Sequence, residues 1–179
     1  MNIIRKQELT VDDMNEVRIG DQIQIGKYAA TCQKITDNTV IFLLDQNLDK
    51  TYQMNHLNTN EGGYDASEFR ANVTEDFETD PEFDSIRDSL MPFPNGDLIR
   101  IPTVGEILGE DDFYEMDDAE QWELMKNRQF TGTETEWSWL QNKVRESETA
   151  FAIVCQDGQT GGNSATARFG AWLVIQFAK

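Results

Sequence analysis

The sequence predicts a mixed α+β fold with a mainly antiparallel sheet, short helices and long loops. Three observations predict this class: strand-like alternation in the first third, short amphipathic helical patterns in the middle, and apolar strand-like runs in the last third. The chain has 179 residues, of which 39% are hydrophobic and 10% aromatic, which is enough for a hydrophobic core. We expect an N-terminal extension over residues 1–16 and a single domain over 17–179, with an acidic, insert-like segment over 61–125.

The first organised block, residues 17–48, is expected to form an antiparallel meander. The stretch RIGDQIQIG alternates isoleucine with polar residues at period two, which is typical of a half-buried strand. Residues 27–35 form a second candidate strand. After a turn at Asp37-Asn38, the β-branched run TVIFLL over 39–44 predicts a buried third strand. The Asn-rich residues 45–63 are typical of a surface loop.

Two short helices are expected next. Over 65–73 an Asp or Ser cap precedes Glu in the first turn, and Phe69 and Val73, at i and i+4, are expected to face the core. A second helix is expected after Asp80-Pro81, because proline is favoured at the first helical position. Its inward stripe comprises Phe83, Ile86 and Leu90. The prolines of 91–96 then end the helix.

Residues 98–101 (LIRI) predict a short strand after this break. Thr103 and Glu106 have the three-residue spacing of a capping box, so 103–108 is expected to be a helical turn. Residues 110–125 carry eight acids, and we expect them to form a solvated helix or an ordered loop.

The last third is expected to return to β-structure. Residues 151–155 (FAIVC) and 171–177 (AWLVIQF) are apolar and strand-like, whereas 156–166 are typical of a Gly-rich polar loop. We therefore expect a hairpin with a long connection, whose last strand lies in the interior of a sheet, because an exposed edge of that composition would aggregate. Cys32 and Cys155, both in apolar strand contexts, are expected to be buried and reduced.

The acidic charge is concentrated in one segment. Residues 61–125 hold 20 Asp and Glu against three Arg, a net of −17 out of −18 for the whole chain. We expect this charge to form one strongly negative face that attracts basic surfaces and repels nucleic acid. A solvated face that only keeps the protein soluble is the alternative.

No pattern in the sequence supports catalysis or a cofactor, so we expect a non-enzymatic protein. The single histidine, His56, lies in a polar loop, and there is neither a zinc-binding spacing nor a phosphate-binding loop. Asp80, Glu82 and Asp84 alternate as in a calcium loop, but the required glycine and final glutamate are missing. We therefore expect no metal, although weak binding of a divalent ion stays open for Asp111, Asp112, Asp117 and Asp118.

The chain contains no apolar run of membrane-spanning length, and its first residues have no apolar stretch or small-residue cleavage site, so we expect no signal peptide. We expect a protein of the bacterial cytoplasm, with a place in a virion as the alternative, and no contact with a membrane.

Aromatic residues form a second candidate surface. Trp122 and Trp172 are expected in the core, whereas we expect at most one of Trp137 and Trp139 to point inward and the other to lie at an interface. An exposed tryptophan beside the polar loop 156–166 would suit protein or carbohydrate binding. The residues that we expect to bind a partner are Asp76, Glu78, Asp80, Glu110, Asp111, Asp112, Glu115, Asp117, Asp118, Trp137 and Trp139.

Seven short segments also follow one another in the order of a known family. They are Arg18 to Tyr28, Thr39 to Asp49, Tyr64 to Asn72, Ile99 to Ile107, Trp137 to Leu140, and Phe151 to Gly158 with Phe169 to Ile175. Over roughly residues 17–178 this order resembles the domain-of-unknown-function family numbered 6273, which is frequent in Firmicute genomes and their phages. The resemblance implies a C-type-lectin-like α+β domain with a loop-rich binding face, a phage or mobile-element origin, and no catalytic residue.

These observations favour a protein-binding module whose acidic face docks on a basic partner, with no direct contact to nucleic acid. Such a module could inhibit a nucleic-acid-acting host defence protein, as anti-CRISPR proteins do, because spaced carboxylates imitate phosphates. The alternative is a structural or adhesion module of a virion or tail that binds through its C-terminal aromatic loops. Either reading allows a homo-oligomer.

Overall fold

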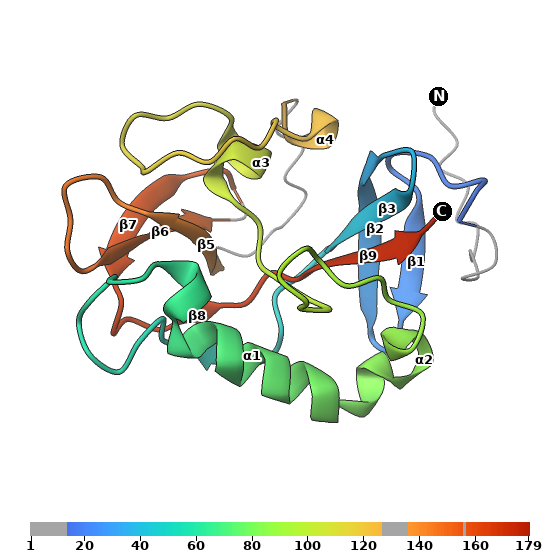
Figure 1. The fold of residues 1–179 in the computed structure, drawn as a ribbon, viewed down its shortest axis with the longest axis horizontal. Helices are drawn as coiled ribbons and strands as arrows, with labels where there is room; N and C mark the ends of the chain where they lie inside the picture. Colours follow the sequence, from blue (N-terminus) through green and yellow to red (C-terminus); the bar gives the residue numbers. More distant parts are fainter. Residues whose placement is uncertain (1–13, 127–135, 156) are drawn as a thin grey trace.

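The computed structural model describes residues 14–126, 136–155 and 157–179, which form a mixed α+β fold with two curled sheets and a few short helices (Figure 1). The first sheet has the order β1-β2-β3-β9, and all of its neighbours are antiparallel. Its strands are β1 (Gln22–Ile25), β2 (Tyr28–Ile35), β3 (Thr39–Leu44) and β9 (Val174–Ala178). The predicted N-terminal meander is confirmed.

The second sheet has the order β4-β8-β5-β6-β7, and only the contact between β5 and β8 is parallel. Its strands are β4 (Thr51–Tyr52), β8 (Phe169–Gly170), β5 (Trp137–Lys143), β6 (Ala150–Cys155) and β7 (Thr160–Ser164). Residues 160–164 were expected to lie in a polar loop. They form the edge strand β7 instead, which pairs with β6, and Gly162 leaves room for Val144, whose Cγ2 would lie 2.3 Å from a Cβ at that position.

The predicted C-terminal hairpin is wrong, because β6 and β9 belong to different sheets. Strand β9 is the last strand of its sheet rather than an interior one. Its outer edge is nevertheless covered: the Met91 amide donates to the Gln176 carbonyl (2.9 Å), and Arg100 exchanges two backbone hydrogen bonds with Val174 (3.2 and 2.7 Å). Residues 98–101 were expected to form a strand. They contribute only the bridge between Arg100 and Val174, which protects the apolar edge of β9.

The helices begin near the predicted signals, but two predicted ends are wrong. The first helix continues to Thr79 instead of ending at Val73, and the second ends at Arg87, before Leu90. Two short 3₁₀ turns, η2 (Tyr64–Ala66) and η3 (Pro81–Phe83), each precede a helix, α1 (Glu68–Thr79) and α2 (Asp84–Arg87). The Ser67 hydroxyl caps α1 by accepting a hydrogen bond from the Arg70 amide. Thr103 and Glu106 form the predicted capping box at the start of α3 (Val104–Leu108), and α4 (Glu123–Lys126) follows a long acidic loop.

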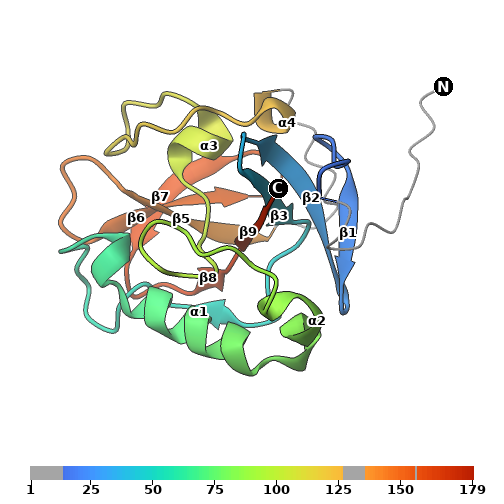
Figure 2. The ribbon, with the colours of Figure 1, turned by 45° about the vertical axis from the view of Figure 1, so that its right-hand side comes forward.

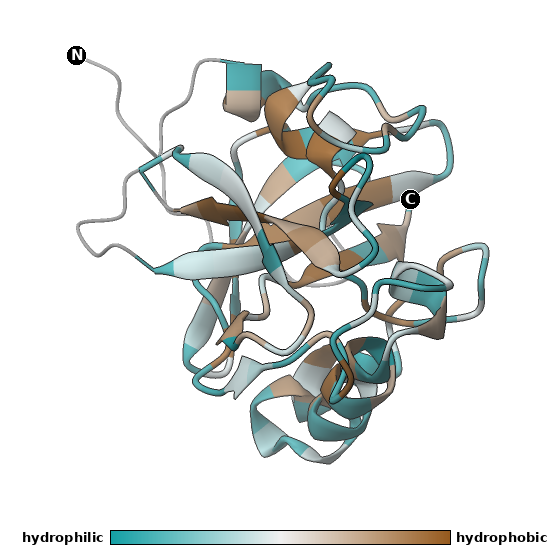
Figure 3. Ribbon diagram, turned by 90° about the vertical axis from the view of Figure 1, so that its left-hand side faces the viewer, coloured by the Kyte–Doolittle hydropathy of each residue, from teal (hydrophilic) through white to brown (hydrophobic). Residues whose placement is uncertain are grey.

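One hydrophobic cluster joins the two sheets and α1. It includes Phe42 from the first sheet, Trp139 and Phe151 from the second, and Phe69 and Phe77 from α1, all at most 1% exposed. The acidic segment 61–125 thus supplies core side chains and is not an insertion outside the core. Figure 3 shows the hydrophobic residues gathered on interior strands and on α3, whereas α1 is largely hydrophilic on the outside.

A second cluster packs α3 and α4 against the other side of β5 and β6. Trp122 is buried there, and both Cys32 and Cys155 are buried free thiols, as expected. None of the described helices is long and apolar enough to cross a membrane.

Helix α1 runs along the base of the molecule from the second sheet towards the first, where α2 continues it (Figures 1 and 2). The segment from α3 to α4 lies at the opposite end in both views. This arrangement decides where the acidic residues lie.

Candidate functional site

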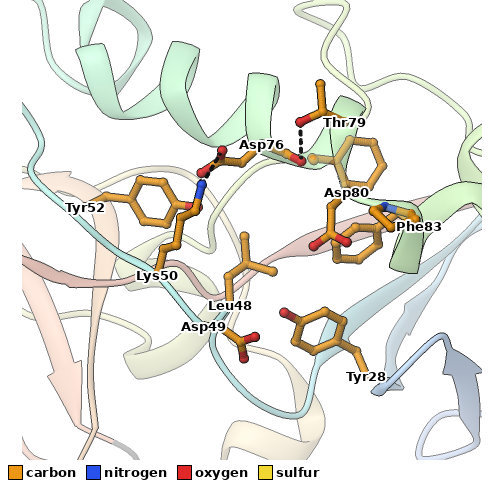
Figure 4. Close-up of a pocket in the computed structure, with 11 residues that line it drawn as sticks. Tyr28, Leu48, Asp49, Lys50, Tyr52, Asp76, Thr79, Asp80 and Phe83 are labelled. Atoms are coloured by element: carbon orange, nitrogen blue, oxygen red, sulfur yellow. Dashed lines mark hydrogen bonds and ion pairs between the residues drawn. The ribbon is translucent and has the colours of Figure 1, made fainter.

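A pocket of about 280 Å³ lies where the end of α1 meets the start of β2 and the segment that leads into β4 (Figure 4). We call it the α1 pocket. Its lining combines aromatic rings with carboxylates and one lysine, and comprises Tyr28, Leu48, Asp49, Lys50, Tyr52, Asp76, Phe77, Thr79, Asp80, Pro81 and Phe83.

The end of α1 positions two of the carboxylates. Phe77 is inward and 1% exposed, so the adjacent Asp76 lies at the side of the helix that borders the pocket. Asp80 is the C-cap of α1, and its amide donates the last hydrogen bond of the helix, to the Asp76 carbonyl (2.9 Å). Its side chain then caps η3 by accepting a hydrogen bond from the Glu82 amide (3.0 Å), and Pro81 follows at the first position of that turn.

The floor of the pocket is aromatic. The rings of Tyr28 and Phe83 stack with a centroid distance of 5.4 Å and an interplanar angle of 10°. The ring centroids of Phe77 and Phe83 lie 4.9 Å apart. Tyr28 is only 1% exposed, yet its hydroxyl points into the pocket (Figure 4). Burial, and next the Asp49 charge, raise the pKa of Tyr28, so its hydroxyl stays protonated.

At one side of the pocket, a lysine of the chain itself forms an ion pair with the Asp76 carboxylate. Lys50 Nζ lies 2.8 Å from Asp76 Oδ1, and the Tyr52 hydroxyl donates to Asp76 Oδ2 at 2.7 Å. Burial raises the pKa of Asp76, but the hydrogen bonds from Lys50 and Tyr52 outweigh it, and the net shift is downward. The Asp76 hydrogen bond and charge in turn raise the pKa of Lys50. The site therefore holds a full ion pair at neutral pH.

The other carboxylates differ in how they are paired. Asp49 forms an ion pair with Lys27, beside the pocket. Asp80 has no cationic partner among residues 14–126, 136–155 and 157–179. A polar groove of similar volume continues from the pocket along α1 and shares its central residues; it is lined by Lys50, Thr51, Tyr52, Gln53, Glu68, Asn72, Glu75, Asp76 and Arg168.

The acidic residues predicted to bind a partner are divided between two surfaces rather than one face. Asp76 and Asp80 line the α1 pocket, and Glu78 is exposed on the same helix. The remaining acids lie in the loop between α3 and α4, at the opposite end of the molecule (Figures 1 and 2); they are Glu110, Asp111, Asp112, Glu115, Asp117 and Asp118.

Within that loop, Asp117 has a structural role. Its carboxylate accepts hydrogen bonds from Thr103 Oγ1 and the Gly105 amide (both 3.0 Å), from the Ala119 amide (2.9 Å) and from Asn142 Nδ2 (2.8 Å). Burial opposes its ionisation, but these four bonds together lower its pKa. No oxygen of this carboxylate is left for a partner or an ion.

The expectation for the two tryptophans was wrong. Residues two apart on a strand share a face, so Trp137 and Trp139 of β5 both turn towards the first cluster. Trp139 is fully buried and donates its ring N–H to the Tyr52 carbonyl (2.8 Å), while Trp137 is half-buried. Trp139 cannot contact a partner.

Sequence reasoning missed Tyr28, Lys50 and Tyr52, because they reach α1 only through contacts between residues about twenty to fifty positions apart in the chain. Their types alone, scattered in strands and a polar loop, do not distinguish them from ordinary structural residues. Among the described residues, no group of three or more His, Cys, Asp or Glu is arranged to hold a metal ion. Comparison with models of known protein families, with curated proteins and with solved structures finds no match.

Proposed function

We propose that this chain is a non-enzymatic binding protein that docks on a basic partner through the outer surface of α1 and α2. The observation that carries the proposal is a group of carboxylates on α1 and at the ends of α1 and α2 that have no cationic partners in the described part of the chain; one of them lines the α1 pocket. We call this group the α1–α2 surface; it comprises Glu75, Glu78, Asp80 and Asp88.

This surface suits docking better than the acidic loop does. Helix α1 has 12 residues and is anchored by three buried side chains, so its charges have fixed spacing. In the loop, by contrast, Asp117 is used internally and Glu115 pairs with Lys143 (3.1 Å). A rigid acidic surface beside a partly apolar pocket provides both attraction at a distance and a place to bury contacts.

The partner class follows from the charge. A surface with spaced, unpaired carboxylates complements a groove that otherwise holds phosphates, so the proposal includes inhibition of a nucleic-acid-acting protein. Assignment to the family numbered 6273, a C-type-lectin-like topology and a phage or mobile-element origin are part of this proposal and rest on the order of the sequence motifs. The mixed α+β architecture, with mostly antiparallel sheets, supports the fold class in this proposal.

The test is affinity capture from a bacterial lysate with two charge-matched variants. One variant carries Glu75→Gln, Glu78→Gln, Asp80→Asn and Asp88→Asn; the control carries Glu110→Gln, Asp112→Asn, Asp118→Asn and Glu120→Gln, all in the acidic loop. Both lose four negative charges, and asparagine keeps the cap at position 80. We expect the first variant alone to lose a basic protein that the wild type retains at about 50 mM salt and releases at about 500 mM. The proposal is wrong if both variants lose the basic protein equally, or if the wild type still retains it at about 500 mM salt.

One observation favours a second candidate, a virion or tail module. Strand β7 ends its sheet, and its sequence TGGNS carries no charge and no proline to block pairing with another chain. Replacing Thr160, an exposed residue of the same strand, by proline would then abolish self-assembly measured by sedimentation, whereas neutralising the α1–α2 surface would leave it unchanged.

A further inference from the structure

We propose that the α1 pocket receives an arginine side chain of the partner, which displaces Lys50 from Asp76. This inference rests on the proposed function and names the contact that would give it specificity. Three features of the described residues carry it: a replaceable internal cation, a carboxylate without a cation, and a buried tyrosine whose hydroxyl points into the cavity.

The internal cation already shows which charge the pocket accepts. Asp76 is held in place, because its Oδ2 accepts the Tyr52 hydroxyl while its Oδ1 faces Lys50. The Lys50 side chain is 69% exposed, whereas that of Asp76 is 30% exposed. An exposed lysine in such a pair contributes little stability, so a better-fitting cation can replace it at low cost.

Asp80 provides a second carboxylate for the incoming group. Its side chain projects towards the pocket from the end of α1 (Figure 4). One of its oxygens, Oδ1, accepts a hydrogen bond from the Glu82 amide. Lys50 leaves this carboxylate without an ion pair. A guanidinium has five donors in a planar fork and can bond two carboxylates at once, which an ammonium does less well.

A buried tyrosine supplies a further polar contact. The Tyr28 side chain is only 1% exposed, yet its hydroxyl points into the cavity (Figure 4), where its oxygen can accept a hydrogen bond from a guanidinium. Leu48 supplies an apolar wall for the methylene stem. The cavity, about 280 Å³, lies at the lower limit of the roughly 300–1,000 Å³ typical of small-molecule sites, which suits one long side chain.

The polar groove beside the pocket extends the contact. It shares Lys50 and Asp76 with the pocket and adds Glu68 and Glu75 along α1. An extended basic segment with one arginine in the pocket would thus lie along the helix, with its neighbouring residues over the groove.

The experiment uses three short peptides with neutral flanks, Ac-Gly-Gly-X-Gly-Gly-amide, in which X is arginine, lysine or citrulline. Binding to the full chain is followed by chemical-shift titration of the backbone amides at low salt. We expect the arginine peptide to shift the signals of residues 48–52 and 76–83, and citrulline, which has the shape without the charge, to bind at least about tenfold more weakly. Equal affinities for arginine and citrulline, or for arginine and lysine, overturn the inference.

Variants of the chain distinguish displacement of Lys50 by arginine from a general attraction of the peptide to negative charge. Lys50→Met removes the competing cation and keeps the stem, so arginine should bind more tightly, by up to about fivefold. Asp80→Asn should weaken it by about tenfold, while Asp118→Asn, with the same charge change in the acidic loop, should have no effect. Weaker binding in Lys50→Met, or equal loss in Asp80→Asn and Asp118→Asn, overturns the inference.

These outcomes are distinct from those of the affinity capture. If the arginine peptide fails to bind while the four-charge variant loses its basic partner, the surface docks without the pocket. If the peptide binds but no basic protein is captured, the pocket accepts arginine and the proposed docking function is wrong.

Discussion

The guanidinium of Arg100 and the carboxylate of Glu106 form a bidentate ion pair inside the protein, with N–O distances of 2.8 and 2.6 Å. Their side chains are only 14% and 10% exposed. Arg100 also bonds through its backbone to Val174 of β9, and Glu106 completes the capping box of α3. The pair thus connects the cover of the first sheet with the helix above the second.

Replacing Glu106 by glutamine should lower the free energy of unfolding by about 3 kcal/mol, because it leaves the Arg100 charge buried without its partner. Urea denaturation followed by far-UV circular dichroism measures this. The control, Glu110→Gln, changes an exposed residue and should alter the stability by less than about 0.5 kcal/mol. Equal stabilities of the two variants would show that the ion pair contributes nothing.

The Asp117 carboxylate should make stability depend on pH in acid. Its folded-state pKa lies below the ordinary value of 3.8, so its contribution is present above that pH and is lost as the pH falls through the folded pKa. Asp117→Asn should therefore destabilise the protein at neutral pH, and this difference from the wild type should shrink below about pH 4. Urea titrations at several pH values measure it. Asp118 is exposed, so the stability of the control Asp118→Asn should equal that of the wild type at every pH. If the stability difference between Asp117→Asn and the wild type does not change with pH, the prediction is wrong.

Gly26 should be required where the β1–β2 turn contacts η3. Its φ is +54°, and a Cβ there would lie 2.1 Å from Glu82 Oε2 and 2.7 Å from the Glu82 carbonyl oxygen. We expect Gly26→Ala to cost about 2 kcal/mol or more and to weaken arginine binding, because Glu82 is two residues from Asp80. Gly20, with φ +93° and no atom within 4 Å of such a Cβ, is the matched control for backbone strain. Thermal unfolding should show a smaller loss for Gly20→Ala; equal losses would mean that the contact with Glu82 is unimportant.

Trp139 should act through the core rather than through a partner. Trp139→Ala would remove a fully buried ring and leave the Tyr52 carbonyl without its donor, so we expect a loss of about 3–5 kcal/mol. Trp137→Ala, at a half-buried position on the same face, should cost clearly less. Chemical denaturation distinguishes the two. A wild-type stability for Trp139→Ala would contradict the packing described.

Local features of the sequence determined the first three strands, the cap of α1 and the capping box of α3. Period-two alternation, β-branched runs and the Ser67 and Thr103 caps act over a few residues, so they can be recognised without knowledge of the fold. The apolar strand context of both cysteines and the i, i+4 spacing of Phe69 and Val73 also determined that these four side chains would be buried.

Tertiary structure alone decided which strands pair and where the charges lie. Strand β9 pairs with β3 rather than with β6, and β7 forms from a Gly-rich stretch, because strand pairing depends on the packing of distant segments. The acidic segment crosses the molecule, so its charges separate into two surfaces although they are adjacent in sequence. The α1 pocket exists only because residues 28, 48–52 and 76–83 meet in space, a long-range contact that no local pattern specifies.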